Sequence, residues 1–327
     1  MASGKILRQL VKAGAVGDTS AFRQVSEAII LEERQKQHHL LANDLEQILY
    51  GHAKPLTSNT LSRLMPAIPT DKERGLPLLD VRQPQRSLEE LVTSRAGQVA
   101  IEELLEEHRR QDVLHTYGLQ ASSKVLFWGP PGCGKTLAAE VIACELDLPL
   151  AIVRLDALVS SYLGETAANL RKVFDFIAQY PLVALFDEFD ALGKERADNT
   201  EHGELRRVVN AVLQMMDAYR GKSLIVAATN HERILDSAVW RRFDDTLEFP
   251  LPSAELLVKV LQLKLRGVRR QFELGSPDVL ELFQGLSPAD IERIVRRGIK
   301  RMILRNQEFL GLKDLVQARE RELRPAN

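Results

Sequence analysis

The chain has 327 residues, of which 45% are hydrophobic and 27% charged, and this composition suits a globular protein of about two or three domains. A formal net charge of −1 excludes the strongly basic surface of a protein that binds nucleic acid or anionic membranes along its whole length. Two cysteines, Cys133 and Cys144, are too few for a disulfide framework or a metal cluster, so both are expected to be plain thiols. Because neither a signal peptide nor a membrane span is found, a cytoplasmic protein is expected.

The first part of the chain predicts a helical region followed by a linker. Apolar residues recur at helical spacing over residues 1–50, which predicts a small helical region that binds a partner or substrate. Residues 51–87 contain five scattered prolines among polar residues, a pattern that favours a partly extended linker. A loop packed on a larger domain is the alternative.

From residue 88 onward, helical and strand patterns alternate. A Ser-x-x-Glu capping box at Ser87 precedes a helix, and the later elements expected are strands at 124–128, 150–155, 183–186 and 224–228 and a helix at 137–146. Strands that alternate with helices predict a parallel sheet flanked by helices, here a large α/β domain over 88–250. Residues 251–327 have a helical pattern throughout and predict an all-α domain.

The strongest motif follows the strand expected at 124–128. It has the pattern G-x-x-x-x-G-K-[ST] of a P-loop NTPase and consists of Gly129, Pro130, Pro131, Gly132, Cys133, Gly134, Lys135 and Thr136. Glycines let backbone N–H groups turn toward phosphate, and the helix expected from Leu137 offers its positive end to the anion. Lys135 is expected to reach the phosphates and the Thr136 hydroxyl to bind Mg²⁺, so the ligands expected are ATP and Mg²⁺.

Polar residues end two further strands. Asp187 and Glu188 follow the apolar run 183–186, where Asp187 is expected to hold the water shell of Mg²⁺ and Glu188 to activate the attacking water. Asn230 ends the strand expected at 224–228 and is expected to bond the γ-phosphate and the water. Helix capping by the two acids and a turn-forming role of the asparagine are the structural alternatives.

This order of motifs over about residues 88–300 resembles the AAA ATPase family within the AAA+ group. The resemblance rests on GPPGCGKT, FDEFD at 186–190, AATN at 227–230 and the stretch LDSAVWRRFD at 235–244. It implies that Arg241 and Arg242 act as arginine fingers in a neighbouring subunit's ATP site, within a ring that is usually a hexamer. The paired arginines look like the single-ring branch of severing and membrane-remodelling ATPases, and the N-terminal part resembles small bacterial AAA proteins. A solvated strand edge is the other interpretation of the pair.

The same resemblance extends to the all-α domain and to a loop. Residues 285–291 are similar to the family's lid motif, which implies that Ala289 contacts the adenosine, although Pro288 replaces the usual glycine and removes a donor. Tyr162, Leu163 and Gly164 match the aromatic–hydrophobic–glycine pore loop of members that thread proteins. An aromatic side chain can grip an extended chain through a large contact area. Half-buried packing of the tyrosine is the alternative.

These expectations favour an ATP-driven remodeller that threads a protein substrate through a ring homo-oligomer. The chain has no protease or nuclease motif, so a destructive step would need a separate protease or other effector. A nucleotide-dependent regulatory scaffold without threading is the second hypothesis. A nucleic-acid motor is disfavoured by the charge balance and by the neutral Ser160 and Ser161 beside the pore motif.

Overall fold

We describe the protein from a computed structural model, whose described residues are 25–26, 28–29, 67–72, 74–158, 163–189, 211–231 and 237–322. The chain divides into two compact units, Met1–Pro66 and Ala67–Asn327. The four described residues of the first unit are helical, in agreement with the helical spacing of the sequence there. Among the described residues, no helix has both the length and the apolar character to cross a membrane.

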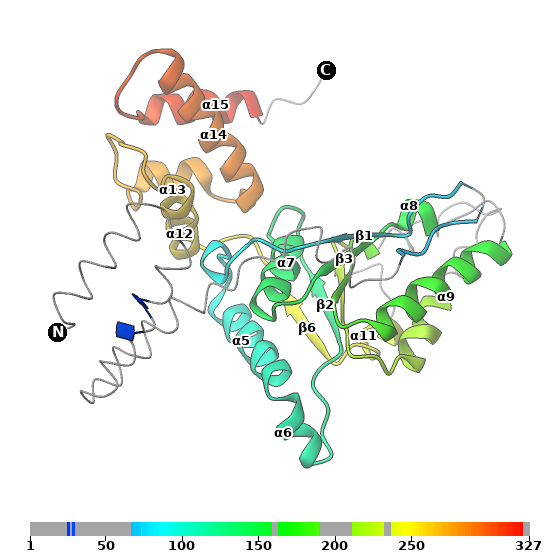
Figure 1. Ribbon diagram of the computed structural model, residues 1–327. Helices are drawn as coiled ribbons and strands as arrows, with labels where there is room; N and C mark the ends of the chain where they lie inside the picture. Colours follow the sequence, from blue (N-terminus) through cyan, green and yellow to red (C-terminus); the bar gives the residue numbers. More distant parts are fainter. Residues whose placement is uncertain are drawn as a thin grey trace. The chain divides into compact units, whose positions relative to one another are not determined.

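One sheet organises the second unit (Figure 1). Among the described residues its strands are β1 (Leu79–Arg82), β2 (Lys124–Trp128), β3 (Leu150–Val153), β4 (Val183–Phe186), β5 (Leu224–Thr229) and β6 (Asp245–Glu248). They lie in the order β1-β3-β4-β5-β2-β6, and every neighbouring pair is parallel except β1 with β3. The predicted parallel sheet is confirmed for β2 to β6, whose carboxyl ends therefore share one edge.

Helices cover both faces of this sheet (Figure 1). Those described are α5 (Arg95–Arg109), α6 (Gln111–Thr116), α7 (Lys135–Glu145), α8 (Leu155–Leu158), α9 (Leu163–Gln179), the helical residues 211–218, and α11 (Ser237–Trp240). Because side chains alternate along a strand, β4 directs Val183 and Leu185 into a core that includes residues of α5 and α7. Phe186 points to the other face, where its ring centroid lies 5.8 Å from that of Phe174 in α9.

Strand positions agree with the sequence pattern, whereas element ends differ slightly. β2 and β4 have the predicted bounds, and β5 extends one residue further than the predicted 224–228. β3 is shorter than the predicted 150–155 because Leu155 begins α8. α7 begins at Lys135, directly after the last glycine of the motif and two residues before the predicted start.

The capping box at Ser87 forms, but it caps a single turn. The Glu90 carboxylate accepts a hydrogen bond from the Ser87 N–H at 3.4 Å, and the turn is the 3-10 helix η1 (Leu88–Glu90). The long helix α5 starts only afterwards, where the Ser94 hydroxyl accepts from the Gly97 N–H at 3.1 Å. The sequence signal therefore marks the turn before the helix rather than the helix itself.

The prediction of a linker over 51–87 is wrong for residues 67–87, because these residues belong to the second unit. The alternative, a loop packed on a larger domain, describes them better. Leu78 and Leu79 are buried, and β1 pairs antiparallel with β3. Ahead of β1, the buried carboxylate of Asp71 accepts a hydrogen bond at 3.2 Å from Asn169 of α9. Proline is tolerated at an edge strand, so the prolines on either side of β1 are compatible with a strand at this position.

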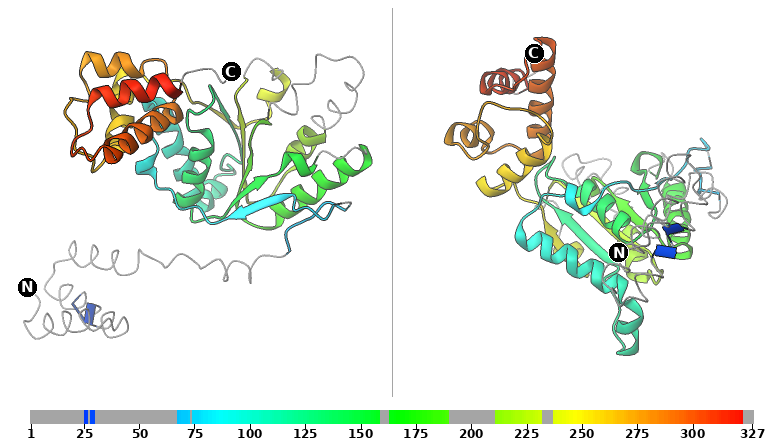
Figure 2. Two further views of the ribbon diagram at one scale, coloured as in Figure 1. Left: turned by 90° about the horizontal axis from the view of Figure 1, so that it is seen from above. Right: turned by 60° about the vertical axis from the view of Figure 1, so that its left-hand side comes forward.

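The C-terminal helices form a group with its own core (Figure 2). They are α12 (Ala254–Lys264), α13 (Pro277–Phe283), α14 (Pro288–Leu304) and α15 (Leu312–Glu322). Ser253 and Ser287 cap α12 and α14, because each hydroxyl accepts from a backbone N–H of the first turn. The helical pattern predicted from residue 251 is confirmed, and the start of α14 lies against the glycine-rich loop, where the Ala289 N–H donates to the Gly132 oxygen at 3.1 Å.

Candidate active site

The glycine-rich loop connects β2 to α7 at the carboxyl edge of the sheet, as the sequence predicts. Gly129, Gly132 and Gly134 have φ angles of 137°, 74° and 100°, a region that glycine adopts without a steric penalty. Loops of this kind turn successive N–H groups toward a common point, and α7 adds the positive end of its dipole. The loop therefore has the local geometry of an anion site.

Two of these glycines also let other segments approach the loop. A Cβ atom on Gly129 would lie 2.3 Å from the carbonyl oxygen of Phe249, which follows β6. A Cβ atom on Gly132 would lie 2.7 Å from the Ser287 hydroxyl and 2.9 Å from the Ala289 Cβ. The loop is thus packed between the end of β6 and the start of α14.

We expect Gly129→Ala to lower the free energy of unfolding by about 1–3 kcal/mol, because the new methyl group meets backbone at a strained φ. Urea unfolding followed by tryptophan fluorescence measures this, since Trp128 lies next to the substituted residue. Gly275→Ala is the matched control, because Gly275 has open space around it and no positive φ. Equal stability of the two variants would contradict the close approach at Gly129.

Lys135 lies at the first position of α7 and is buried. Its ammonium group donates to the carbonyl oxygens of Gly129 and Pro130 at 2.7 and 2.8 Å. Hydrogen bonds in which both partners are charged are the stronger ones, so phosphate oxygens can compete with these carbonyls for the ammonium group. The loop thereby holds its own cation where an anion would enter.

Thr136 and the acidic pair meet although they are far apart in the sequence. The Thr136 hydroxyl donates to the Asp187 carboxylate at 2.7 Å, and the other Asp187 oxygen accepts from the Glu188 N–H at 2.9 Å. A hydroxyl and a carboxylate in contact are the hard oxygen donors that Mg²⁺ prefers, so the residues fit this ion. Glu188 is exposed and has a φ of 50°, a backbone conformation that is uncommon for residues other than glycine and concentrates at functional sites.

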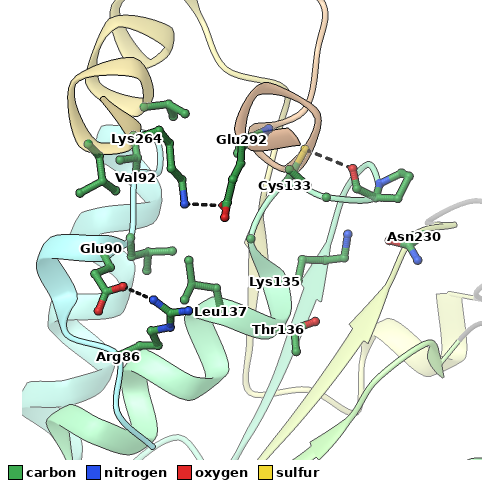
Figure 3. A pocket seen from close by; sticks show the side chains of 18 of the residues that line it. Arg86, Glu90, Val92, Cys133, Lys135, Thr136, Leu137, Asn230, Lys264 and Glu292 are labelled. Atoms are coloured by element: carbon green, nitrogen blue, oxygen red, sulfur yellow. Dashed lines mark hydrogen bonds and ion pairs between the residues drawn. The ribbon is translucent and has the colours of Figure 1, made fainter. Parts of the chain in front are cut away.

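These residues line a cavity of about 470 Å³ (Figure 3), within the usual range of small-molecule sites. Its lining contains the following predicted site residues: Pro131, Gly132, Cys133, Gly134, Lys135, Thr136, Leu137, Asp187, Glu188, Asn230 and Ala289. Gly129 and Pro130 join them through their hydrogen bonds to Lys135. Segments more than 150 residues apart in the chain thus converge on one cavity.

Residues 125–251 match the family model described as ATPase family associated with various cellular activities (AAA). The chain is 41% identical over 324 residues to an uncharacterized AAA family ATPase of Sinorhizobium fredii, with 99% of this chain and 96% of the relative covered. The chain belongs to the AAA family of ATPases. It is also 31% identical over 206 residues to a putative 26S proteasome regulatory subunit homolog of Methanocaldococcus jannaschii, with 62% of this chain and 56% of that relative covered.

Membership of the AAA family confirms the resemblance carried by the motifs and the prediction of ATP hydrolysis to ADP and phosphate. Pro288, which departs from the family's lid motif, occupies the first turn of α14. A missing N–H is harmless at that position because the first turn of a helix has no intrahelical acceptor. The Ala289 N–H makes the contact with the loop instead, at the Gly132 oxygen.

The paired arginines of this AAA chain lie away from the cavity, whose lining includes neither of them. Arg241 is exposed, and the Arg242 Nε lies 2.9 Å from a carboxylate oxygen of Asp217 in the helical residues 211–218. Both arginines precede β6, whereas the loop glycines and Asn230 follow β2 and β5. Because β2, β5 and β6 are parallel, the arginines leave the amino edge of the sheet and the loop and Asn230 leave its carboxyl edge.

The predicted pore loop is only partly within the described residues, because Tyr162 lies outside them. The prediction that Leu163 and Gly164 lie in a loop is wrong, since both belong to the first turn of α9. An acidic Glu165 in that turn and alanines after it favour helix, and they outweigh the single glycine.

Four charged residues at the cavity were not predicted from the sequence. Arg86 and Glu90 pair at 2.5 Å on one side, and Lys264 of α12 pairs with Glu292 of α14 at 2.5 Å on the other (Figure 3). The hydrogen bond from Lys264 holds the pKa of Glu292 below its usual range. Arg86 and Glu90 have the i,i+4 spacing of a local pair, whereas nothing local links Lys264 to Glu292. Apolar lining residues that were also missed are Leu91, Val92, Val260 and Leu263.

Both cysteines are free thiols, as the sequence predicts. Cys133 is buried within the loop, and burial raises the pKa of its thiol. Burial also raises the pKa of Cys144, in α7. Since the thiolate is the nucleophile and metal ligand, neither cysteine is activated for such chemistry.

Proposed function

We propose that the protein works as a ring of AAA subunits, usually six in this family, in which an arginine of one copy completes the ATP site of the next. The position of Arg241 and Arg242 carries this proposal. They precede β6 at the amino edge of the sheet and are absent from the lining of the cavity, which lies at the carboxyl edge. Since neither arginine lines the cavity of its own copy, a contribution to catalysis requires a second copy packed head to tail.

In this proposal the backbone N–H groups of Gly129–Thr136 bind the phosphates of ATP, and Lys135 pairs with the β- and γ-phosphate oxygens. The apolar lining, with Leu137 and Ala289, accepts the adenosine. Thr136 and Asp187 hold Mg²⁺, which neutralises phosphate charge when it is bound. The hydrogen bond between these two side chains supports the assignment, because it holds the two oxygens close enough to bind the same ion.

Hydrolysis needs a base and an orienting group beside the terminal phosphate. Glu188 is exposed to solvent at the cavity, so its carboxylate can take the proton of the water that attacks the γ-phosphorus while ADP leaves. Asn230, at the carboxyl end of β5, lines the same cavity and orients that water. The arginine from the neighbouring copy stabilises the charge that develops on the transferred group.

We further propose that the work done is the remodelling of a protein substrate pulled through the ring by Tyr162, Leu163 and Gly164. The similarity to a protein named as a proteasome regulatory subunit homolog supports a protein substrate. Residues 251–327 then act as a lid over the nucleotide, and the helical region 1–50 recruits the substrate or a separate effector such as a protease. α9 begins at the pore residues and is followed by β4, whose carboxyl end precedes Asp187 and Glu188, and this connection is a route by which nucleotide state can act on the pore.

Tyr162→Ala tests the threading step. We expect basal ATP turnover within about twofold of wild type and loss of the stimulation by casein, an unstructured protein used as probe, because the aromatic contact with the chain is gone. Tyr162→Phe is the matched control and keeps the stimulation.

Two outcomes would contradict threading by this residue. Full stimulation of the alanine variant by casein would exclude Tyr162 as the grip. A wild-type chain whose turnover ignores casein and other unstructured proteins would favour the nucleotide-dependent scaffold instead.

A further inference from the structure

The short helix α6 and its flanking residues 110–121, which we call the α6 arm, protrude from the rest of the second unit (Figures 1 and 2). α6 has six residues and none of them is buried. Three apolar side chains of the arm are nevertheless exposed: Val113 at 53%, Tyr117 at 79% and Leu119 at 58%. Gathered apolar side chains that face water on an element without a core of its own mark a surface that packs against something else.

The three side chains belong to one compact tip. Val113 and Tyr117 are four residues apart and therefore lie on the same side of the helical turn. Gly118 has a φ of 72° and reverses the chain, after which the Leu119 N–H donates to the Leu114 oxygen at 3.0 Å. Leu119 is thereby folded back toward the end of α6.

The base of the arm is tied to α5. The Ser122 N–H donates to the Glu107 carboxylate at 2.8 Å, and the Ser122 oxygen lies 2.8 Å from the His108 Nε2. Burial lowers the pKa of His108, so a neutral imidazole that donates to this carbonyl is the form favoured near pH 7. Hydrogen bonds at both groups of Ser122 fix where the arm leaves the body.

The same base is tied to the segment that carries the paired arginines. One Asp244 carboxylate oxygen accepts from the N–H groups of Ser123 and Lys124 at 2.8 and 2.9 Å, and the Asp244 N–H donates to the Lys124 oxygen at 2.8 Å. Asp244 is only two residues after Arg242. The α6 arm and the arginines therefore leave the sheet at the same edge, from strands that are neighbours.

We infer that the α6 arm packs against the neighbouring copy of this chain, on the side that holds that copy's ATP site. This inference rests on the proposed ring, because the arginines can reach an ATP site only if their edge of the sheet faces the next subunit. The base of the arm is bonded to that edge through Asp244, so a copy seated on the edge is in a position to meet the arm. A second copy is therefore the occupant, and Tyr117, the most exposed of the three, is the anchor expected to contribute most.

The double variant Tyr117→Ser with Leu119→Ser tests the inference in the full-length chain. We expect the protein concentration for half assembly to rise by at least about tenfold, as for removal of a tyrosine anchor from an interface. Sedimentation velocity in Mg²⁺ and a slowly hydrolysed ATP analogue measures assembly. The thermal midpoint of the unassembled chain should stay unchanged, since neither side chain is buried. The double variant Ile303→Ser with Leu304→Ser removes two exposed apolar side chains of α14 and is the matched control.

Three results would overturn the inference, and they can be told apart. If wild type and arm variant assemble at the same concentration, the proposed contact of the α6 arm is refuted, while the proposed ring is unaffected. A wild-type chain that remains monomeric with the ATP analogue would refute the ring together with the arm. A loss of assembly equal to that of the α14 control would show a general effect of surface polarity and would also count against the arm.

Discussion

Arg242→Ala is expected to reduce ATP turnover by about 10³–10⁵-fold, the range found where an arginine finger is removed. The reason is that the guanidinium group stabilises charge in the transition state and leaves the ground state largely unaffected, so ATP binding should change little. Phosphate release measures turnover, and a fluorescent ATP analogue measures binding. Arg220→Ala is the matched control. The Arg220 guanidinium group also donates to Asp217, but to the backbone oxygen of Asp217 and not to its carboxylate.

Mixed rings decide whether this arginine acts on a neighbouring copy. Arg242→Ala subunits keep their own Glu188, and Glu188→Gln subunits keep their own Arg242. A site is therefore complete where an Arg242→Ala subunit binds the ATP and the neighbour that supplies the arginine is a Glu188→Gln subunit, whereas the reverse order lacks both groups. Random equal mixing should restore about a quarter of the sites in a head-to-tail ring. Inactive mixtures of assembled rings would contradict a site shared between subunits.

Glu188→Gln is expected to retain ATP binding and to reduce hydrolysis by about 10²–10⁴-fold, the usual contribution of a positioned general base. The amide has the size of the carboxylate but cannot accept the proton of the attacking water. Glu292→Gln is the matched control. Glu292 also lines the cavity, but it lies on α14 and pairs with Lys264.

The measurement is single-turnover phosphate release together with retention of ATP by the variant after gel filtration. Turnover within a few-fold of wild type would exclude Glu188 as the base. A variant that retains ATP would also serve to capture the unidentified protein substrate, because the nucleotide state that grips the substrate would persist.

Much of the site could be predicted from the sequence because its parts lie at the ends of buried strands. β2 is a short apolar run followed by the glycine-rich loop, and β4 is one followed directly by Asp187, so each pattern predicts both a strand and a functional residue beyond its end. Parallel strands then bring those ends to the same edge.

Other features depend on packing between segments that carry no mutual signal. β1 has only four residues between prolines, and its pairing with β3 is set by burial of Leu79 against the sheet. The contact of Lys264 with Glu292 requires α12 and α14 to pack side by side. At Gly164 a local preference for a bend was outweighed by the neighbouring helix formers, which a motif comparison does not weigh.

The attachment of residues 67–82 to the edge of the sheet has a mechanical consequence. Tension passed along the chain from the first unit enters the second at Ala67. Bonds met early on that path are those of the Thr70 oxygen with Lys172 and of Asp71 with Asn169, followed by the pairing of β1 with β3. Asp71 and Asn169 are both buried, so water does not readily replace their bond. A load on the N-terminal region is therefore carried into α9 and β3, and it bypasses the glycine-rich loop.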